Sequence, residues 1–331
     1  MSQRPWGCRP GVVRSFGRTA GAAVLLLAPI LLSGCSGDGA PTRFYSLGTG
    51  GTGGIYYPLG GGIASRLSAA DSAATFTAEV TGGSVENVNR VVGGQIDLGF
   101  ALAITAYQAH EGEGDYAGRG DARLRVLAPL YPNRVHVLVG RRVDATGIED
   151  LRGAAVAVGS AGSGTEQSAR EILGAYGLSY DDITVRYLSF SESASAIRDG
   201  AVDAAFLSVG FPAGAVLEAT TTGGARLLPV SGRGAERLVA EHPYYRAGTI
   251  PAGTYPGLDE DLTTVSMMNW IVGLDSLEPG VVRSLLNILG PGRVSLEQVH
   301  EMASQIDLGE LRSSPIPLHP ETERWLAETG S

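Results

Sequence analysis

Short apolar runs, glycine-rich turns and amphipathic segments alternate along most of this chain. The run Phe44–Leu47 predicts a β-strand, and the apolar residues that recur every fourth position from Ile55 to Leu67 predict a helix after it. A second strand at Thr75–Val80 and an amphipathic segment with valines at 85, 88 and 92 extend the pattern. Strands and helices that alternate in this way are typical of a parallel sheet covered by helices.

The same order of elements occurs twice. A second copy begins at Gly153, with a strand at Ala154–Val158, a Gly/Ser turn, a helix and a strand at Ile183–Leu188. Each copy ends in Gly-x-apolar-Asp before an apolar strand, and we expect Asp97 and Asp203 to cap or orient loops there. Because ligands bind at the carboxyl ends of such strands, the duplication predicts an α/β protein of two lobes with a cleft between them.

The division into lobes follows the Pro/Gly-rich stretches. Residues 43–130 are predicted to form the first part of lobe 1, and residues 131–252 are predicted to form lobe 2. The segment Leu127–Asn133 separates the two copies and is the expected first crossover. Residues 253–331 are then expected to return to lobe 1 and to end in C-terminal helices.

The N-terminus has the pattern of a lipoprotein signal. Four arginines within the first 18 residues precede the apolar run Gly21–Leu32, which is short and is interrupted by Pro29. The run ends in Leu-Ser-Gly-Cys35, which resembles the bacterial lipobox. Residues 1–35 are therefore predicted to be a signal peptide with lipidation at Cys35, and residues 36–42 a flexible tether. An ordinary secretory signal with an incidental cysteine is the alternative.

This N-terminus predicts an extracytoplasmic protein that is anchored to the cell membrane through the lipid. The only other cysteine, Cys8, would leave with the signal, so no disulfide is expected. The formal net charge of −9 would fall to about −13 after cleavage, because the signal carries four arginines and no acidic residue. Such a charge disfavours nucleic acid as a partner.

The glycine-rich stretch within Phe44–Gly62 predicts an anion site, because unpaired N–H groups and a helix dipole converge where a strand, a glycine loop and a helix follow one another. The same loop satisfies G-x-G-x-x-G, a dinucleotide fingerprint. However, no acidic residue closes a second strand about 20 residues on, and Asp71 lies in a polar turn. We therefore expect a small anionic or zwitterionic ligand and no cofactor.

The candidate ligand residues are hydroxyl, amide, aromatic and glycine positions at the expected strand ends. They are Thr49, Gly50, Thr52, Gly53, Tyr56, Tyr57, Ser84, Asn87, Tyr131, Ser163, Thr165, Ser208 and Gly210. Helix capping is the alternative role for Ser84 and Asn87, and the spacing of Ser163 and Glu166 fits a capping box. Arg134 could pair with a carboxylate, although an exposed surface arginine is the simpler interpretation.

Catalytic patterns are weak in this sequence. It contains no G-x-S-x-G elbow and no nucleophile–base pair at a recognisable spacing. The five histidines show no close ligand spacing, so no metal site is predicted. His319-Pro320 is predicted to begin the last helix instead. The chain is therefore expected not to be an enzyme.

Seven blocks, in order, resemble the TAXI family, the TRAP-associated extracytoplasmic immunogenic solute receptors. They are GTGGTGGIYYPLGGGIA, TGGSVENVNRVVGGQIDLGF, LAPLYPNRVHVLV, DLRGAAVAVGSAGSGT, GAVDAAFLSVGFPAGAV, IPAGTYPG and the terminal PIPLHP. The resemblance implies a type II periplasmic-binding-protein fold that closes on its ligand by a hinge. This sequence departs from the family pattern at two places. They are Leu102-Ala103, where members often carry a polar pair, and Glu321-Thr322, where Gly-Ala is usual.

The resemblance implies a function as well. It predicts a monomeric receptor that captures a small carboxylate or amino acid, of the glutamate, glutamine or 2-oxoglutarate class, and delivers it to a TRAP permease subunit in the membrane. A ligand-sensing lipoprotein that presents its closed form to a membrane receptor kinase would use the same cleft. It remains the alternative.

Overall fold

The computed structural model describes residues 42–330. The predicted signal peptide, the lipobox with Cys35 and nearly all of the predicted tether lie outside the described residues. Among the described helices, none has both the length and the apolar character that a membrane span requires.

The first copy of the repeated module folds as the sequence pattern predicts. Its elements are β1 (Arg43–Gly48), α1 (Tyr56–Ala70), β2 (Ala74–Glu79), α2 (Ser84–Val92) and β3 (Leu98–Leu102). Strand β1 pairs in parallel with β2 on one side and with β3 on the other. The buried face of α1 carries Leu59, Ile63 and Leu67, whose spacing of four residues predicted the helix.

The second copy repeats this topology. Its elements are β5 (Ala155–Ala157), α4 (Gly164–Ala175), β6 (Thr184–Arg186), α5 (Phe190–Asp199) and β7 (Ala204–Val209). Strand β5 pairs in parallel with β6 and with β7, as β1 does with β2 and β3. The predicted duplication is thus confirmed at the level of strand order.

Two aspartates hold corresponding positions in the copies. Asp97 Oδ2 accepts a hydrogen bond from Ser46 N in β1 at 2.8 Å, and the Asp97 N–H donates back to Ser46 O. Asp203 Oδ2 accepts from Ala155 N in β5 at 2.8 Å, and the Asp203 N–H donates to Ala155 O. Each carboxylate therefore ties the loop before the third strand of its module to the first strand, which is the orienting role expected for it.

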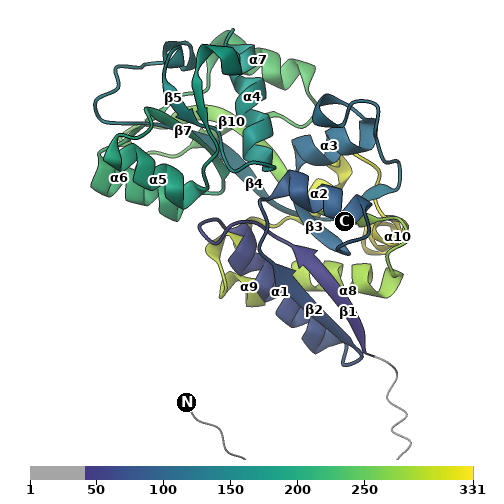
Figure 1. The fold of residues 1–331 in the computed structure, drawn as a ribbon. Coiled ribbons are helices and arrows are strands. Elements are labelled where there is room, and N and C mark those ends of the chain that lie inside the picture. Colours follow the sequence, from purple (N-terminus) through teal and green to yellow (C-terminus); the bar gives the residue numbers. More distant parts are fainter. Residues whose placement is uncertain (1–41, 331) are drawn as a thin grey trace, which may run out of the picture. The chain divides into compact units, whose positions relative to one another are not determined.

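Two long antiparallel strands join the modules. Strands β4 (Leu124–Val139) and β10 (Leu262–Leu274) pair with each other along most of their length. β10 also pairs with β3, and the last part of β4 pairs with β7, so the sheet order is β2-β1-β3-β10-β4-β7-β5-β6. Figure 1 shows these two strands running between the two groups of helices. The predicted crossover Leu127–Asn133 lies inside β4.

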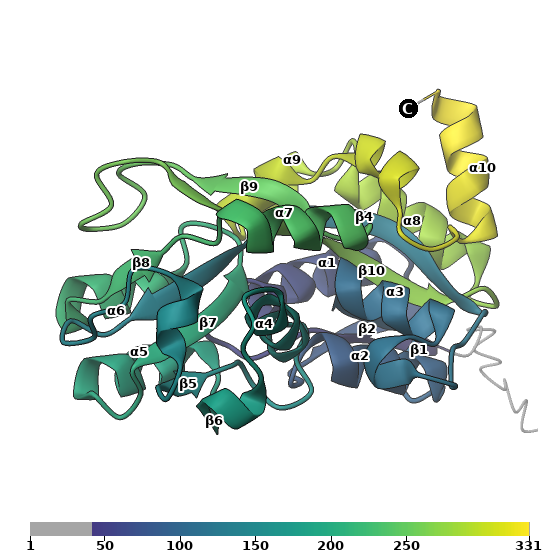
Figure 2. The same cartoon turned by 90° about the horizontal axis from the view of Figure 1, so that it is seen from above.

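The remaining elements cover the two groups. They are α3 (Ala103–Glu111), α6 (Gly214–Gly223), β8 (Arg226–Leu228), α7 (Gly232–Glu241), β9 (Arg246–Ile250), α8 (Pro279–Leu289), α9 (Val294–Glu297), α10 (Pro320–Thr329) and five short 3₁₀ turns. β9 pairs with β10, and β8 pairs with β4. Helices α8 and α10 lie side by side, and α8 also packs on α1 of the first module (Figure 2). His319 caps α10 through the Glu321 N–H, as predicted.

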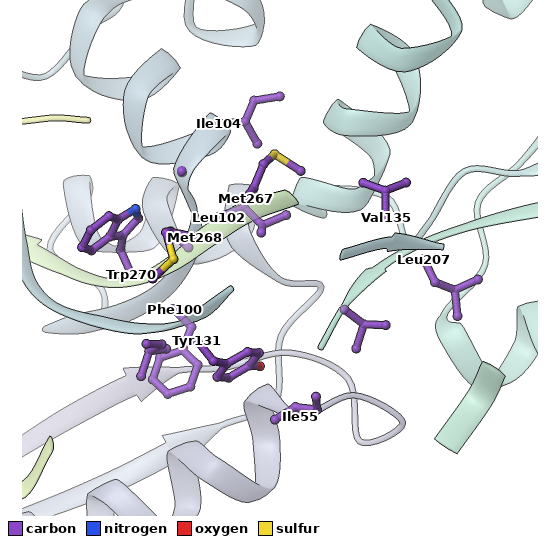
Figure 3. Packing of buried hydrophobic residues seen from close by; sticks show 14 of the residues in the cluster. Ile55, Phe100, Leu102, Ile104, Tyr131, Val135, Leu207, Met267, Met268 and Trp270 are labelled. Carbon is purple, nitrogen blue, oxygen red and sulfur yellow. The ribbon is translucent and has the colours of Figure 1, made fainter. Parts of the chain in front are cut away.

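The core at the junction of the modules contains large aromatic side chains among aliphatic residues and methionines. Phe100 of β3, Tyr131 of β4 and Trp270 of β10 are all buried (Figure 3). Phe100 also meets Tyr56 of α1 edge to face, with ring centroids 5.1 Å apart. Large rings of this kind bury much apolar area and stack with defined geometry, so they fix α1 and β3 against the two connecting strands.

A buried histidine links β4 to the loop before β10. His136 Nδ1 lies 3.0 Å from Arg134 O, and its Nε2 lies 3.0 Å from the Tyr255 hydroxyl. Since a carbonyl only accepts, the Nδ1 carries the proton and the Nε2 accepts from the tyrosine. That hydroxyl in turn accepts from the Ala213 N–H at 3.0 Å. Burial lowers the pKa of His136 from its ordinary 6.5 to about 4.

We predict that His136 makes the protein sensitive to mild acid. In the unfolded chain the ring takes up a proton below about pH 6.5, whereas the folded chain resists protonation until about pH 4. Stability contributed by the neutral ring is therefore present above pH 6.5 and is lost as pH falls, by about 3 kcal/mol at pH 4. His136→Gln should be less stable at pH 7 but should lose less stability than wild type between pH 7 and pH 4. Denaturant melts across this range test it; parallel pH profiles would contradict it.

Candidate functional site

A cavity of about 290 Å³ lies at the junction of the two modules. From lobe 1 it is lined by the loop Gly50–Tyr56, Val80, Gly82–Ser84 and Leu102. From lobe 2 it is lined by Ser160, Ser163–Thr165, Ser189–Ser191, Ser208 and Val209, and from β4 by Tyr131 and Asn133. Both modules therefore contribute their loops at the strand ends, which is where the duplication places a binding cleft.

In the described part of the chain, residues 42–330, four helices begin at this cavity. The first residues of α1 and α2 line it from lobe 1, and those of α4 and α5 line it from lobe 2. Each helix has at least nine residues, and each N-terminus presents N–H groups without intrahelical partners and the positive end of a helix dipole. None of the lining residues is Asp, Glu, Lys, Arg or His.

Several N–H groups at these helix ends remain available. The Ser163 hydroxyl accepts from Glu166 N, and the Ser189 hydroxyl accepts from Glu192 N, so each serine caps the third N–H of its helix. Within residues 42–330, no hydrogen bond is made by the N–H groups of Gly164, Thr165, Phe190 or Ser191. Oriented donors with no side-chain cation nearby suit a small anion.

The two lobes touch beside the cavity, where the start of α2 meets the loop before α4. The Glu86 N–H of α2 donates across the junction to Gly162 O at 3.2 Å. A methyl group added at Gly164 would lie 2.7 Å from Leu102 Cδ1 and 2.8 Å from Ser84 Oγ, so these side chains would have to shift to admit it. The structure is therefore one in which the lobes are in contact around the cavity.

A buried chain of hydrogen bonds joins the cavity to both lobes. The Tyr56 hydroxyl of α1 donates to Asn269 Oδ1 on β10. Asn269 Nδ2 donates to Tyr131 O and to Asn133 Oδ1, both at 2.7 Å, and Asn133 Nδ2 donates to Ser208 O on β7 at 2.7 Å. Burial raises the pKa of Tyr56 well above its ordinary value, so its hydroxyl stays protonated and can donate.

Nine of the thirteen candidate ligand residues line the cavity. They are Gly50, Thr52, Gly53, Tyr56, Ser84, Tyr131, Ser163, Thr165 and Ser208. The other four lie elsewhere: Thr49, Tyr57, Asn87 and Gly210. Thr49 is fully buried and its hydroxyl donates to Glu79 O, while Tyr57 is exposed on α1. Gly210 packs against Met302 and Ile55.

The capping role considered for Ser84 and Asn87 is wrong. Gly83, at a φ of 117°, is the residue before α2, and the Ser84 hydroxyl accepts from the Leu102 N–H at 3.0 Å. Asn87 Nδ2 donates to Thr49 O and Phe100 O, so this residue holds the first glycine loop to β3. The residue that precedes α2 is therefore Gly83 and not Ser84, so the helix begins one residue earlier than a Ser84 cap would require. The positive φ of Gly83 is not visible in the sequence pattern.

The cavity includes residues that the candidate set omits. Ser160, Gly164 and the segment Ser189–Ser191 line it from lobe 2, and Asn133 lines it from β4. Ser189 and Glu192 form a reciprocal capping box. The S-x-x-E spacing of this pair was visible in the sequence and could have located the start of α5 at the strand end.

Two charged residues considered in the sequence are structural. Only half of the capping box expected for Ser163 and Glu166 forms: the Ser163 hydroxyl accepts from Glu166 N, but the Glu166 carboxylate pairs with Arg170 at 2.6 Å and accepts from the Tyr180 hydroxyl at 2.8 Å. Its role is structural, as expected. Arg134 donates to Ser266 Oγ at 2.7 Å and lies over the Phe211 ring, away from the cavity lining. Among residues 42–330, no group of three or more His, Cys, Asp or Glu side chains is placed to hold a metal ion.

Comparison with known families assigns the chain. The model of the NMT1-like family matches residues 47–330. This chain belongs to the NMT1-like family. The expected assignment to the TAXI family of TRAP receptors is therefore wrong. Three of the seven blocks contain glycine-rich turns before helices at strand ends, those of α1, α2 and α4. A fold that binds ligands at helix N-termini requires such turns whichever family it belongs to.

Solved structures share the fold. MatC from Rhodopseudomonas palustris with bound malate is 13% identical, with a TM-score of 0.55 over 87% of this chain and 98% of that one. PhnD1 from Prochlorococcus marinus in complex with methylphosphonate is 12% identical, with a TM-score of 0.54 over 87% of this chain and 97% of that one. The predicted α/β, two-lobed periplasmic-binding-protein fold is confirmed.

We predict that Asn269→Ala destabilises the protein by about 3 kcal/mol. The change leaves the Tyr56 hydroxyl, Tyr131 O and Asn133 Oδ1 buried without their partner, and each such group costs about 1–3 kcal/mol. Asn287→Ala, at an exposed position of α8, is the matched control and should change the free energy of unfolding by less than about 0.5 kcal/mol. Urea melts of both variants test this, and equal losses would contradict it.

Proposed function

We propose that this protein is an extracytoplasmic solute-binding protein that holds a small anion between its lobes and delivers it to a membrane transporter. The observation that carries the proposal is the convergence of four helix N-termini on one cavity that has no charged side chain in its lining. An anion bound there would be neutralised by backbone dipoles and N–H groups, without a salt bridge.

The size and closure of the cavity support a metabolite-sized ligand. Its volume of about 290 Å³ is at the low end for small-molecule sites. Contacts between Gly164 and Leu102, and between Glu86 and Gly162, close it on the side of α2 and α4, whereas Thr52, Gly53 and Ser191 on its other side are exposed. Binding would then couple to the separation of the lobes, because the donors come from both.

The chemical class of the solute is a second part of the proposal. We propose a carboxylate or a similar oxyanion, since charge-assisted N–H···O bonds are worth about 1.5–3 kcal/mol each. MatC holds malate and PhnD1 holds methylphosphonate in the structures that share this fold. The TRAP type of permease followed only from the TAXI resemblance, which the family match contradicts. The proposal is therefore delivery to a membrane transporter of unspecified class.

The supporting experiment is a ligand screen on protein stripped by unfolding and refolding. Dicarboxylates, oxo acids, amino acids, phosphonates and sulfonates are each titrated while the melting temperature is followed. Saturation at about 100 times Kd should add about 2.7 kcal/mol, which raises Tm by roughly 5 °C or more in a protein of this size. Folded protein that responds to none of these compounds would exclude the small-anion proposal.

We further predict that Gly164→Ala weakens binding of the solute found in that screen about tenfold or more. The added methyl group would meet Leu102 and Ser84 of the opposite lobe, so the present separation of the lobes would cost a shift of both side chains. Gly174→Ala, in the same helix, is the control, because a methyl group there meets no atom within 4 Å. Calorimetric titration measures both, and unchanged affinity in Gly164→Ala would show that closure to this separation is not needed.

A further inference from the structure

The four helix N-termini at the cavity are arranged as two cross-lobe pairs. At one end, Gly53 before α1 packs directly on Ser191 of α5, and Gly54 lies against the Phe190 ring. We call this the α1/α5 pole. It contains the lining residues Gly53, Gly54, Ser189, Phe190 and Ser191. Helix ends from different lobes thus meet here.

The other end of the cavity is built in the same way. A methyl group at Gly83 before α2 would lie 3.6 Å from Ser163 Cβ, and Gly164 of α4 approaches Ser84 of α2. We call this the α2/α4 pole, and Ser160 in the loop before α4 belongs to it. The Glu86 N–H is already used by Gly162 O, but the N–H groups of Gly164 and Thr165 are unpaired within the described residues.

The duplication explains why there are two poles. Helix α1 of the first module corresponds to α4 of the second, and α2 corresponds to α5. Exchange of the two modules therefore converts the α1/α5 pole into the α2/α4 pole. A site made from one repeated module offers the same kind of donor set twice, at its two ends.

Two further observations indicate the ligand. Ser208 on β7 lines the cavity and is 4% exposed, and its hydroxyl has no hydrogen-bond partner within the described residues. A buried hydroxyl without a partner costs free energy, which a ligand oxygen between the poles would recover. No carboxylate lines the cavity, so an ammonium group on the ligand would be buried without a counter-charge.

From this arrangement we infer that the solute is a small, extended dianion with one anionic group at each pole and no ammonium group. The inference rests on the proposed solute-binding function and narrows it. The TAXI resemblance implied the glutamate, glutamine or 2-oxoglutarate class, and of these glutamate and glutamine carry an ammonium group and do not fit the lining. A short dicarboxylate without an amine does.

The first test compares matched ligands by calorimetric titration of the purified protein. Succinate and glutarate supply two carboxylates, succinamate replaces one carboxylate by a neutral amide, and aspartate and glutamate add an ammonium group. The better dicarboxylate should bind at least tenfold more tightly than succinamate and than its amino counterpart. Equal or tighter binding of the amino acid, or of succinamate, would overturn the inference.

The second test places a carboxylate at one pole at a time. Ser191→Asp acts at the α1/α5 pole and Ser160→Asp at the α2/α4 pole, and each is compared with the neutral Ser→Asn variant at its site. Affinity for the dicarboxylate should fall at least tenfold from Asn to Asp at both poles. Affinity for succinamate should fall from Asn to Asp at only one of the two poles, because its single carboxylate occupies only one pole. Loss of dicarboxylate affinity at a single pole would contradict the two-pole site.

A remote charge and a folding check complete the design. Ser304→Asp adds the same charge at an exposed position outside the cavity and should leave the dicarboxylate affinity unchanged. Thermal melts establish that every variant is folded. If folded wild type bound none of these ligands or those of the wider screen, the proposed function itself would fail. Equal or tighter binding of an amino acid or a monoanion would refute only the inference that the solute is a dianion, and the proposed solute-binding function would stand.

Discussion

The antiparallel pairing of β4 with β10 is the constraint on which the rest of this structure depends. Each module alone is a three-stranded parallel unit, β2-β1-β3 or β6-β5-β7. β10 pairs with β3 and β4 pairs with β7, so the two strands join the units into one sheet and fix where their strand ends face each other. The cavity exists because this pairing brings both sets of loops to one place.

The same pair of strands carries the polar chain that reaches the cavity. Asn269 on β10 and Asn133 on β4 satisfy one another, and together they hold Tyr56 from lobe 1 and the backbone of Ser208 from lobe 2. Buried amides of this kind are stable only when every donor and acceptor is matched. A change in the relative position of the lobes would therefore either preserve this set of hydrogen bonds or break it as a whole. This favours two discrete arrangements of the lobes over a continuous range of positions.

Much of this fold was predictable from the sequence, because periodic apolar residues and glycine turns are local signals. The fourfold spacing from Ile55 to Leu67 located α1, and the repeated Gly-x-apolar-Asp pattern located Asp97 and Asp203 before the third strands. The candidate site was predicted less completely. Thr49 follows β1 and Asn87 lies in the first turn of α2, both beside the glycine turns, but their side chains bond to backbone carbonyls inside the protein. The direction of a side chain depends on tertiary packing, which the sequence pattern does not give.

The wrong family assignment and the incomplete set of ligand residues have a common physical origin. A helix N-terminus at a strand end needs a tight turn, a cap and small residues, whichever solute it serves, so those motifs identify the fold more securely than the family or the ligand. Specificity depends on what is absent from the lining as much as on what is present, and an absence is visible only once the cavity has been assembled. Here the missing carboxylate excludes a counter-charge for an ammonium group, whereas the repeated helix ends supply donors at two places. Selection for a dianion would then follow directly from duplication of one anion-binding module, without a single charged side chain in the site.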